Sequence, residues 1–295
     1  MDREEIFNRF DNLNVWKRGD ERAPHKPLLI LYALGKCSRD EDRWISFSEV
    51  NVNLRKLLVD FGPPRRSVHP EYPFWRLQGD GLWELSEGAN ELIRRQGHTD
   101  ALKSELIDHK VFGGFPVQLF ESLSKDHRLL TEIAESVLEK NFPASLHEDI
   151  LSAVGLDIWQ KTTRRKRDPA FQHRILVAYE YKCAICGFDV RLNNVSIGIE
   201  AAHIKWHQAG GPDTEDNGIA LCILHHKIFD RGAITINKNY EILVSQLVNG
   251  SKGLQDLILN YKNQQMRMPQ STTFYPNMRY IVWHQEQVFR GPHRP

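Results

Sequence analysis

Residues 181–230 read YKCAICGFDVRLNNVSIGIEAAHIKWHQAGGPDTEDNGIALCILHHKIFD, and this stretch decides the fold of the C-terminal half. It contains the pair Cys183-x2-Cys186 and, after 35 intervening residues, the pair Cys222-x2-His225. Together the pairs supply four thiolate or imidazole ligands, the number that a closed tetrahedral zinc site needs. A single C-x-x-C pair is also typical of redox sites, but the second pair favours a metal. We therefore predict a structural Zn²⁺ bound by these four side chains.

Three further polar residues lie between and beside these pairs, namely His203, Asn217 and His226. Their separations are 14 and 9 residues. Phosphodiester hydrolysis needs a base that removes a proton from water, and an imidazole with a pKa near ~6.5 can do this. It also needs neutralisation of the phosphate charge, which a divalent cation provides. The stretch therefore has the residue types of a metal-dependent nuclease.

The order and spacing of these residues resemble the HNH endonucleases, over about residues 165–240. The resemblance implies a ββα-metal fold in which His203 is the general base and His226 binds the catalytic metal. It also implies that Asn217 fixes the loop and orients His203. In the zinc-stabilised members a C-x-x-C pair precedes the motif, and His225 stands here where the fourth cysteine usually stands.

One expected metal ligand is missing, because Ala202 occupies the position before the base. Glu200 lies two residues before Ala202 in a predicted strand, so it shares that residue's face and could bind the ion instead. Asp230 follows His226 by four residues and shares its helical face. Either carboxylate could also act as an orienting or capping group. Carboxylate and water ligands suit Mg²⁺ or Mn²⁺, and added imidazole also admits Co²⁺, Ni²⁺ or Zn²⁺.

The length of 295 residues corresponds to about two domains, at ~100–200 residues each. We place the boundary near residue 160, before the basic run at 164–167, which could bind phosphate or be a solvated linker. The predicted fold class is α+β. A mainly helical DNA-binding domain with a small β-hairpin (1–160) precedes a ββα-metal (HNH) nuclease domain with structural zinc (161–295).

Within the N-terminal half, periodicity and turn residues predict specific elements. Helices are expected at 27–36, 87–96, 101–108, 126–140 and 146–154, the last ending at Gly155. The turn signal Gly79-Asp80-Gly81 predicts a hairpin between strands at 74–78 and 82–85.

Two segments of this half carry candidate DNA contacts. Residues 22–29 (RAPHKPLL) place His25 and Lys26 at a helix N-terminus, where backbone N–H groups favour anions. Residues 69–77 (HPEYPFWRL) offer Tyr72 and Pro73 as an apolar surface beside Arg76.

Together the two segments resemble the sulfur-binding domain of phosphorothioate-dependent (type IV) HNH restriction endonucleases, which precedes an HNH domain in that family. The resemblance implies that Tyr72 and Pro73 are the walls of a pocket for the sulfur atom and that His25 and Lys26 form its cationic rim. The family often has Arg where Lys26 stands. Arg76 is a further candidate by position.

The predicted function is therefore metal-dependent cleavage of phosphorothioated double-stranded DNA. A nuclease directed at a modified base such as methylcytosine, and a non-cutting zinc-stabilised DNA-binding protein, remain alternatives. The net charge of +1 selects no partner. The longest apolar run, residues 28–34, is too short to cross a membrane and the N-terminus lacks a secretory signal, so we expect a cytoplasmic protein of a prokaryotic cell. Two cuts in one duplex with one active site per chain suggest a homodimer.

Overall fold

The computed structural model describes residues 1–295 except residues 16, 19–20, 93–99 and 157–168. The chain divides into two compact units, Met1–Trp159 and Gln160–Pro295. Both combine helices with small antiparallel sheets, so the predicted α+β class is confirmed. The expected boundary and the basic run 164–167 lie outside the described residues.

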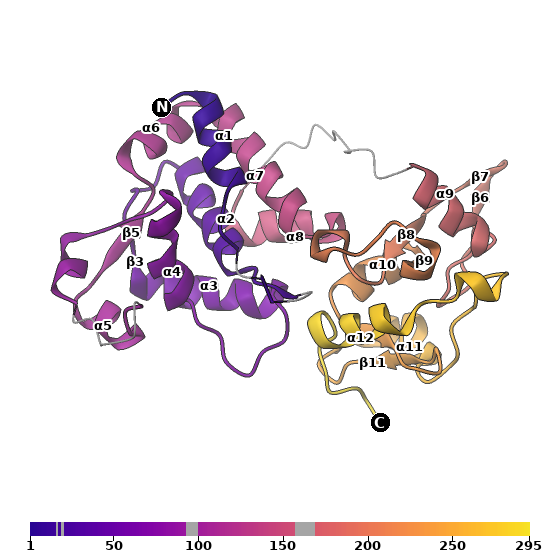
Figure 1. Ribbon diagram of the computed structural model, residues 1–295. Helices are drawn as coiled ribbons and strands as arrows, with labels where there is room; N and C mark the ends of the chain where they lie inside the picture. The colour runs from indigo at the N-terminus through magenta and orange to yellow at the C-terminus, as the bar shows by residue number, and fades with distance from the viewer. Residues whose placement is uncertain (16, 19–20, 93–99, 157–168) are drawn as a thin grey trace. The chain divides into compact units, whose positions relative to one another are not determined.

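The N-terminal unit is built around helix α2 (His25–Ser38), which is buried from Pro27 to Gly35 (Figure 1). Its sequence PLLILYALG has no polar face, as expected for a helix covered on all sides. Helices α3 (Phe47–Phe61), α7 (His127–Asn141) and α8 (Ala144–Val154) pack around it. The buried α2 therefore organises the core of this unit.

Short polar side chains set where several of these helices begin. Asp2, Ser46 and Asp126 each accept a hydrogen bond from a backbone N–H in the first turn of the helix that follows. Gly155 ends α8 in the left-handed region with φ 68°, as predicted. The helices expected at 101–108 and 126–140 are confirmed as α5 (Lys103–Asp108) and α7, whereas Glu87–Glu91 is a 3-10 helix (η2) and 93–99 are not described. The remaining helices are α1 (Arg3–Asp11), α4 (Glu71–Arg76), α5 (Lys103–Asp108) and α6 (Val117–Lys125).

A three-stranded antiparallel sheet lies beside the helices in the order β3 (Ile45–Ser46), β5 (Phe112–Gly114), β4 (Glu84–Leu85). A second ladder pairs β1 (Lys17–Arg18) with β2 (Glu21–Arg22). Both glycines of β5 are required by close packing. A Cβ on Gly113 would lie 2.3 Å from the Trp83 ring nitrogen, and one on Gly114 would lie 1.9 Å from the Arg43 carbonyl oxygen.

The predicted hairpin at 74–85 is wrong. Residues 71–76 form α4, and Leu77–Asp80 continue it as a 3-10 turn that ends at Gly81 with φ 67°. Phe74 and Leu77, three residues apart, are both fully buried, which is helical spacing. The Gly-Asp-Gly signal therefore marks a helix end, which uses the same left-handed glycine as a hairpin turn.

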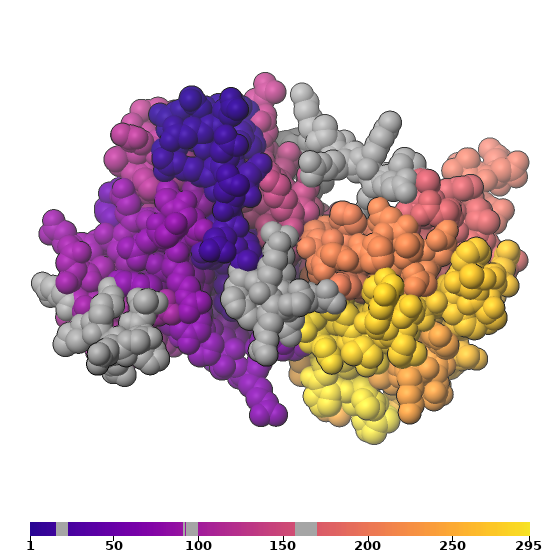
Figure 2. Space-filling model, in the orientation of Figure 1, coloured from indigo at the N-terminus to yellow at the C-terminus, as the bar shows by residue number. Residues whose placement is uncertain are grey.

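The C-terminal unit contains the ββα arrangement that the motif predicted. Strand β8 (Ile199–His203) pairs antiparallel with β9 (Gly218–Cys222), and α10 (Ile223–Asp230) follows directly. Helix α9 (Pro169–Ala178) packs on both strands, so closely that a Cβ on Gly218 would lie 2.3 Å from the Ile175 side chain. The hairpin β6 (Arg191–Leu192) and β7 (Val195–Ser196) extends at the margin of the unit (Figures 1 and 2).

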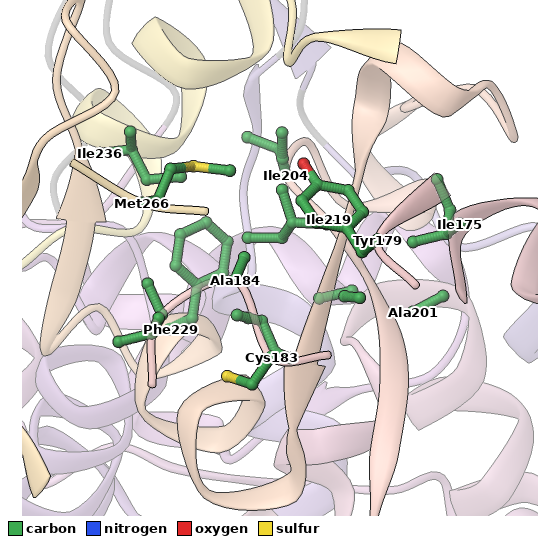
Figure 3. Close-up of a cluster of buried hydrophobic side chains, with 14 of the residues drawn as sticks. Ile175, Tyr179, Cys183, Ala184, Ala201, Ile204, Ile219, Phe229, Ile236 and Met266 are labelled. Atoms are coloured by element: carbon green, nitrogen blue, oxygen red, sulfur yellow. The ribbon is translucent and has the colours of Figure 1, made fainter. Parts of the chain in front are cut away.

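The rest of this unit completes one apolar core. Figure 3 shows Ile204, Ile219 and Phe229 of the ββα segment together with Met266, which comes from far along the chain. No described helix is long and apolar enough to span a membrane. The remaining elements are β10 (Ile234–Ile236), paired with β11 (Ile242–Val244), α11 (Lys252–Leu257), α12 (Met278–Gln287) and the 3-10 turns η3 (His207–Ala209), η4 (Glu215–Asn217), η5 (Leu259–Tyr261) and η6 (Thr272–Phe274).

Candidate functional site

The two Cys/His pairs meet at one end of the β8–β9 ladder. Cys183 and Cys186 lie in the turn after α9, Cys222 ends β9, and His225 lies in the first turn of α10. Their ligand atoms lie within 4.8 Å of one another, so these four residues could hold a metal ion.

The geometry of the cluster fits a tetrahedral ion. Zinc bonds of ~2.3 Å to sulfur and ~2.0 Å to nitrogen imply ligand separations of roughly 3.5–3.8 Å. The structure has 3.6 Å from Cys183 Sγ to His225 Nδ1, 4.0 Å from Cys186 Sγ to Cys222 Sγ, and 3.1 Å from Cys222 Sγ to His225 Nδ1. His225 Nε2 donates to the Leu257 carbonyl at 2.9 Å, which leaves Nδ1 to face the sulfurs.

The charge of the cluster favours a cation. Burial lowers the pKa of His225, but hydrogen bonds with Cys183 and Cys222 outweigh burial and raise it to about 10. The sulfur atoms thus favour positive charge in this site, where a metal ion can replace the proton.

The first motif histidine, His203, ends β8 and is held on two sides. Its Nε2 lies 2.7 Å from Asp213 Oδ1, and its ring stacks on Phe171 with centroids 4.3 Å apart. The Asp213 backbone carbonyl in turn accepts from Arg174 at 2.8 Å. A carboxylate on Nε2 favours the tautomer whose acceptor lone pair is on Nδ1, which suits a base.

The motif asparagine fixes the loop that follows β8. Asn217 is fully buried; its Oδ1 accepts from the Lys205 N–H at 2.9 Å, and its Nδ2 donates to the carbonyls of Lys205 and Pro212 at 3.0 Å each. The expected role in fixing the loop matches these bonds. They involve the backbone of Lys205 and Pro212, not the His203 ring.

The second motif histidine, His226, lies between two carboxylates. Its Nδ1 is 2.7 Å from Glu200 Oε2 on β8, and its Nε2 is 3.1 Å from Asp230 Oδ2 one turn along α10. Burial lowers the pKa of His226, but Asp230 and Glu200 together raise it to about 9. Asp230 is buried and also accepts from Trp206 Nε1 at 3.1 Å, whereas the Glu200 side chain is 36% exposed.

An exposed aromatic residue marks the candidate DNA surface of the N-terminal unit. Tyr72, on α4, stacks on His69 with centroids 4.9 Å apart, and the Arg76 guanidinium lies 4.8 Å from the Tyr72 ring centroid. Arg76 also forms a two-point ion pair with Asp100. The structure therefore brings Tyr72 and Arg76 together, while Pro73 is buried and is not an exposed wall.

His25 faces the same group of side chains. Burial, then the nearby charges of His69 and Arg65, lower the pKa of His25 to about 4. At neutral pH His25 is therefore an uncharged hydrogen-bonding group, and the prediction that it forms part of a cationic rim is wrong.

Lys26 is also placed differently from the prediction. Its ammonium forms an ion pair with Asp80, and the two side chains are only 14% and 4% exposed. Asp80 also accepts from the Asn14 N–H at 2.8 Å. Lys26 is thus a part-buried partner inside the unit. Its contact lies 54 residues away in the sequence, so the local sequence does not reveal it.

The comparison with protein families decides the identity of the N-terminal unit. A model described as the ScoMcrA-like DNA sulfur-binding domain matches residues 3–158, more than half of the chain. The chain belongs to this family. A second model, the HNH endonuclease domain, matches residues 183–237, which include both Cys/His pairs and the three motif residues.

Five solved structures similar to this member of the ScoMcrA-like family have 20–23% sequence identity to it. The sulfur binding domain of ScoMcrA complexed with phosphorothioated DNA is 22% identical, with a TM-score of 0.45 over 51% of this chain and 94% of that chain. The corresponding SprMcrA complex is 22% identical, with a TM-score of 0.46 over 53% and 95%. The type IV phosphorothioation-dependent restriction endonuclease ScoMcrA is 20% identical, with a TM-score of 0.42 over 50% and 28%. No curated protein matches the chain.

Two residues of the HNH unit were missed in the sequence. Asp213 lies ten residues after His203 in an irregular loop, so no periodic signal links the two. Trp206 packs with its ring centroid 5.8 Å from that of Trp283 of α12, and its N–H also donates to Asp230. A tryptophan N–H usually finds an acceptor when it is buried, and this is the one signal that could have suggested the contact.

Proposed function

We propose that this chain is a modification-dependent DNA endonuclease. Residues 1–160 would bind phosphorothioated duplex DNA, and residues 161–295 would hydrolyse a phosphodiester bond nearby. The observation that carries this proposal is the presence, in one chain, of a DNA sulfur-binding family match and an HNH match. The side-chain geometry of the HNH unit supports it.

His203 is the proposed general base. Asp213 accepts a hydrogen bond from the Nε2–H and orients the imidazole, so that Nδ1 can take a proton from the attacking water. Phe171 limits rotation of the ring. Asn217 contributes by holding the loop between His203 and Asp213 in one conformation.

His226 and Glu200 are the proposed ligands of the catalytic divalent cation, with Asp230 in an orienting role. An imidazole ligand commonly donates its second N–H to a carboxylate, and the buried Asp230 fits that part. Glu200, whose side chain is 36% exposed, is in contact with solvent and so with dissolved ions. Mg²⁺, Mn²⁺, Co²⁺ or Ni²⁺ would polarise the phosphate and support the leaving oxygen.

Cys183, Cys186, Cys222 and His225 are the proposed ligands of a structural Zn²⁺. The donor set leaves no open position, which is typical of structural sites. These residues tie the end of β9 and the start of α10, which carries His226, to the turn after α9; β9 in turn pairs with β8, which carries His203.

For sulfur recognition we propose the exposed part of the Tyr72 ring as the apolar wall, with Pro73 as a buried floor. Sulfur is larger and more weakly hydrated than oxygen, so an apolar surface accepts it at lower desolvation cost. Arg76 is placed to neutralise the remaining phosphate charge, and neutral His25 is placed to donate a hydrogen bond. Lys26 would support this surface through Asp80 without touching DNA.

Cleavage is tested with His203→Ala on a phosphorothioated duplex in Mg²⁺, Mn²⁺, Co²⁺ or Ni²⁺. We expect cleavage to be lost while binding to the same duplex is retained. Wild-type protein that binds but does not cut in any of these ions would identify a non-cutting DNA-binding protein, and cutting by the variant would remove His203 as the base.

Recognition is tested with two duplexes that differ in a single sulfur atom. Tyr72→Ala should lose the preference for sulfur over oxygen. Phe112→Ala is a matched control, because Phe112 is also an aromatic residue of this unit and is 40% exposed, against 39% for Tyr72. A preference for a methylcytosine duplex over the sulfur duplex would favour the base-directed alternative.

A further inference from the structure

The β6–β7 hairpin has an apolar face that the described residues of its own unit leave exposed. Leu192 is directly opposite Val195 in the ladder, and the Ile197 N–H donates to the Val190 carbonyl at 2.9 Å. Opposite residues, and residues two apart along a strand, point to the same side of a hairpin. These four side chains therefore share one face, and they are 46–70% exposed.

This face continues onto α10. A Cβ on Gly198 would lie 3.6 Å from Ile223 Cδ1 and 3.7 Å from Phe188 Cε1, so both side chains gather at the base of the hairpin. We call the six residues the hairpin patch: Phe188, Val190, Leu192, Val195, Ile197 and Ile223. Their exposed fractions correspond to roughly 600 Å², as much as the largest patch of a typical monomer.

Such a hairpin needs a partner. A two-stranded hairpin alone is marginally stable in water, and an uncovered apolar face adds a hydration cost. The patch also lies at the opposite end of β8 from His203. Ile199, next to the hairpin, pairs with Cys222, whereas His203 pairs with Gly218 four residues along β8, which is ~13 Å away.

We infer that the hairpin patch is the surface through which two copies of this chain associate. The inference rests on the proposed function, because each chain has one HNH centre and a duplex has two strands to cut. An apolar face of this kind can pair with itself about a two-fold axis. Two copies would bury about 1,200 Å² in total, the lower limit for a specific interface. In such a contact the His203 end of each β8 is turned away from the partner copy.

The test is the mass in solution of the full chain, 34.3 kDa per copy, by sedimentation at several concentrations. We expect wild-type dimers and monomeric Leu192→Glu and Val195→Glu variants with unchanged thermal stability. Leu247→Glu is the matched control, because Leu247 is a leucine of the same unit with the same 67% exposure but lies outside the patch. It should remain dimeric.

A monomeric wild type, or a dimeric Leu192→Glu protein that is correctly folded, would overturn the inference. If the wild type is monomeric and the Leu192→Glu variant binds DNA more weakly than the wild type, the patch is a DNA-binding surface instead. Dimerisation through the patch without cleavage would leave the interface standing and refute the proposed function. Cleavage by a protein that is monomeric on DNA would refute the interface and leave the proposed function standing. Because Leu192→Glu should separate the two copies, it should also convert double-strand cuts to nicks.

Discussion

Substitution of Asp80 by Asn tests whether Lys26 belongs to the interior of the N-terminal unit. The change keeps the size of the side chain and removes the negative charge. The Lys26 ammonium, 14% exposed, then loses the partner that balances its desolvation. The Asn14 N–H can still donate to the new side-chain oxygen, so the effect reports mainly on the ion pair.

Breaking a buried ion pair by removing one partner costs ~3–5 kcal/mol. Because Lys26 keeps some contact with water, we expect the lower end, about 3 kcal/mol. For a unit of this size, Met1–Trp159, each kcal/mol lowers Tm by ~2–4 °C, so the N-terminal transition should fall by roughly 6–12 °C. Differential scanning calorimetry of the full chain measures this shift directly.

Glu121→Gln provides the control, because it removes a carboxylate from the exposed Lys125–Glu121 pair, whose side chains are 76% and 57% exposed. Its expected cost is below ~0.5 kcal/mol. The double variant Lys26→Met with Asp80→Asn should recover part of the loss, since no buried charge remains. An Asp80→Asn protein as stable as Glu121→Gln would refute the buried pair.

The same pair makes a prediction for DNA binding. Each phosphate contact contributes about one unit to the slope of log K against log salt concentration. Lys26→Met should leave this slope unchanged if the ammonium is committed to Asp80. A slope reduced by about one unit would instead place Lys26 on DNA.

Three further predictions follow from the geometry. Asp213→Asn should lower the single-turnover cleavage rate on the order of 10²-fold with DNA affinity unchanged, since only the orientation and tautomer of His203 are lost; an unaltered rate would exclude the pair. Cys222→Ser, or a chelator, should release the zinc, as measured by elemental analysis. The C-terminal calorimetric transition should then be lost while the N-terminal transition remains. The pKa of His25 is about 4 when folded, below ~6.5 for the unfolded chain, so the unfolded state binds more protons between these values. Stability of the N-terminal unit should therefore fall by up to ~3 kcal/mol from pH 6.5 to pH 4, and His25→Asn should remove this part of the urea-midpoint shift.

The sequence predicted the HNH unit well because its information is local. The spacing of Cys222 and His225 needs only one helical turn to bring both side chains to one ion, and β8 and β9 are adjacent strands. The HNH resemblance added the roles expected of the motif residues. The positions of Glu200 and Asp230 beside His226 also follow from strand and helix periodicity.

The N-terminal half was harder because its contacts are distant in sequence. The Gly79-Asp80-Gly81 signal fits a hairpin turn and a helix end equally well, and only the burial of Phe74 and Leu77 decides between them. The uncharged state of His25 results from burial and from His69 and Arg65, which reach it through tertiary packing. Local motifs therefore indicated the residues of the candidate DNA surface but not the charge state of His25.

The neighbouring residues His225 and His226 face different partners, because successive side chains of an α-helix project about 100° apart. One imidazole faces the sulfurs and the Leu257 carbonyl, and the other faces Glu200 and Asp230. Inserting or deleting a single residue between Cys222 and His226 would rotate both rings away from their partners at once. This turn should therefore tolerate no change in length across related chains, even where the flanking loops vary freely.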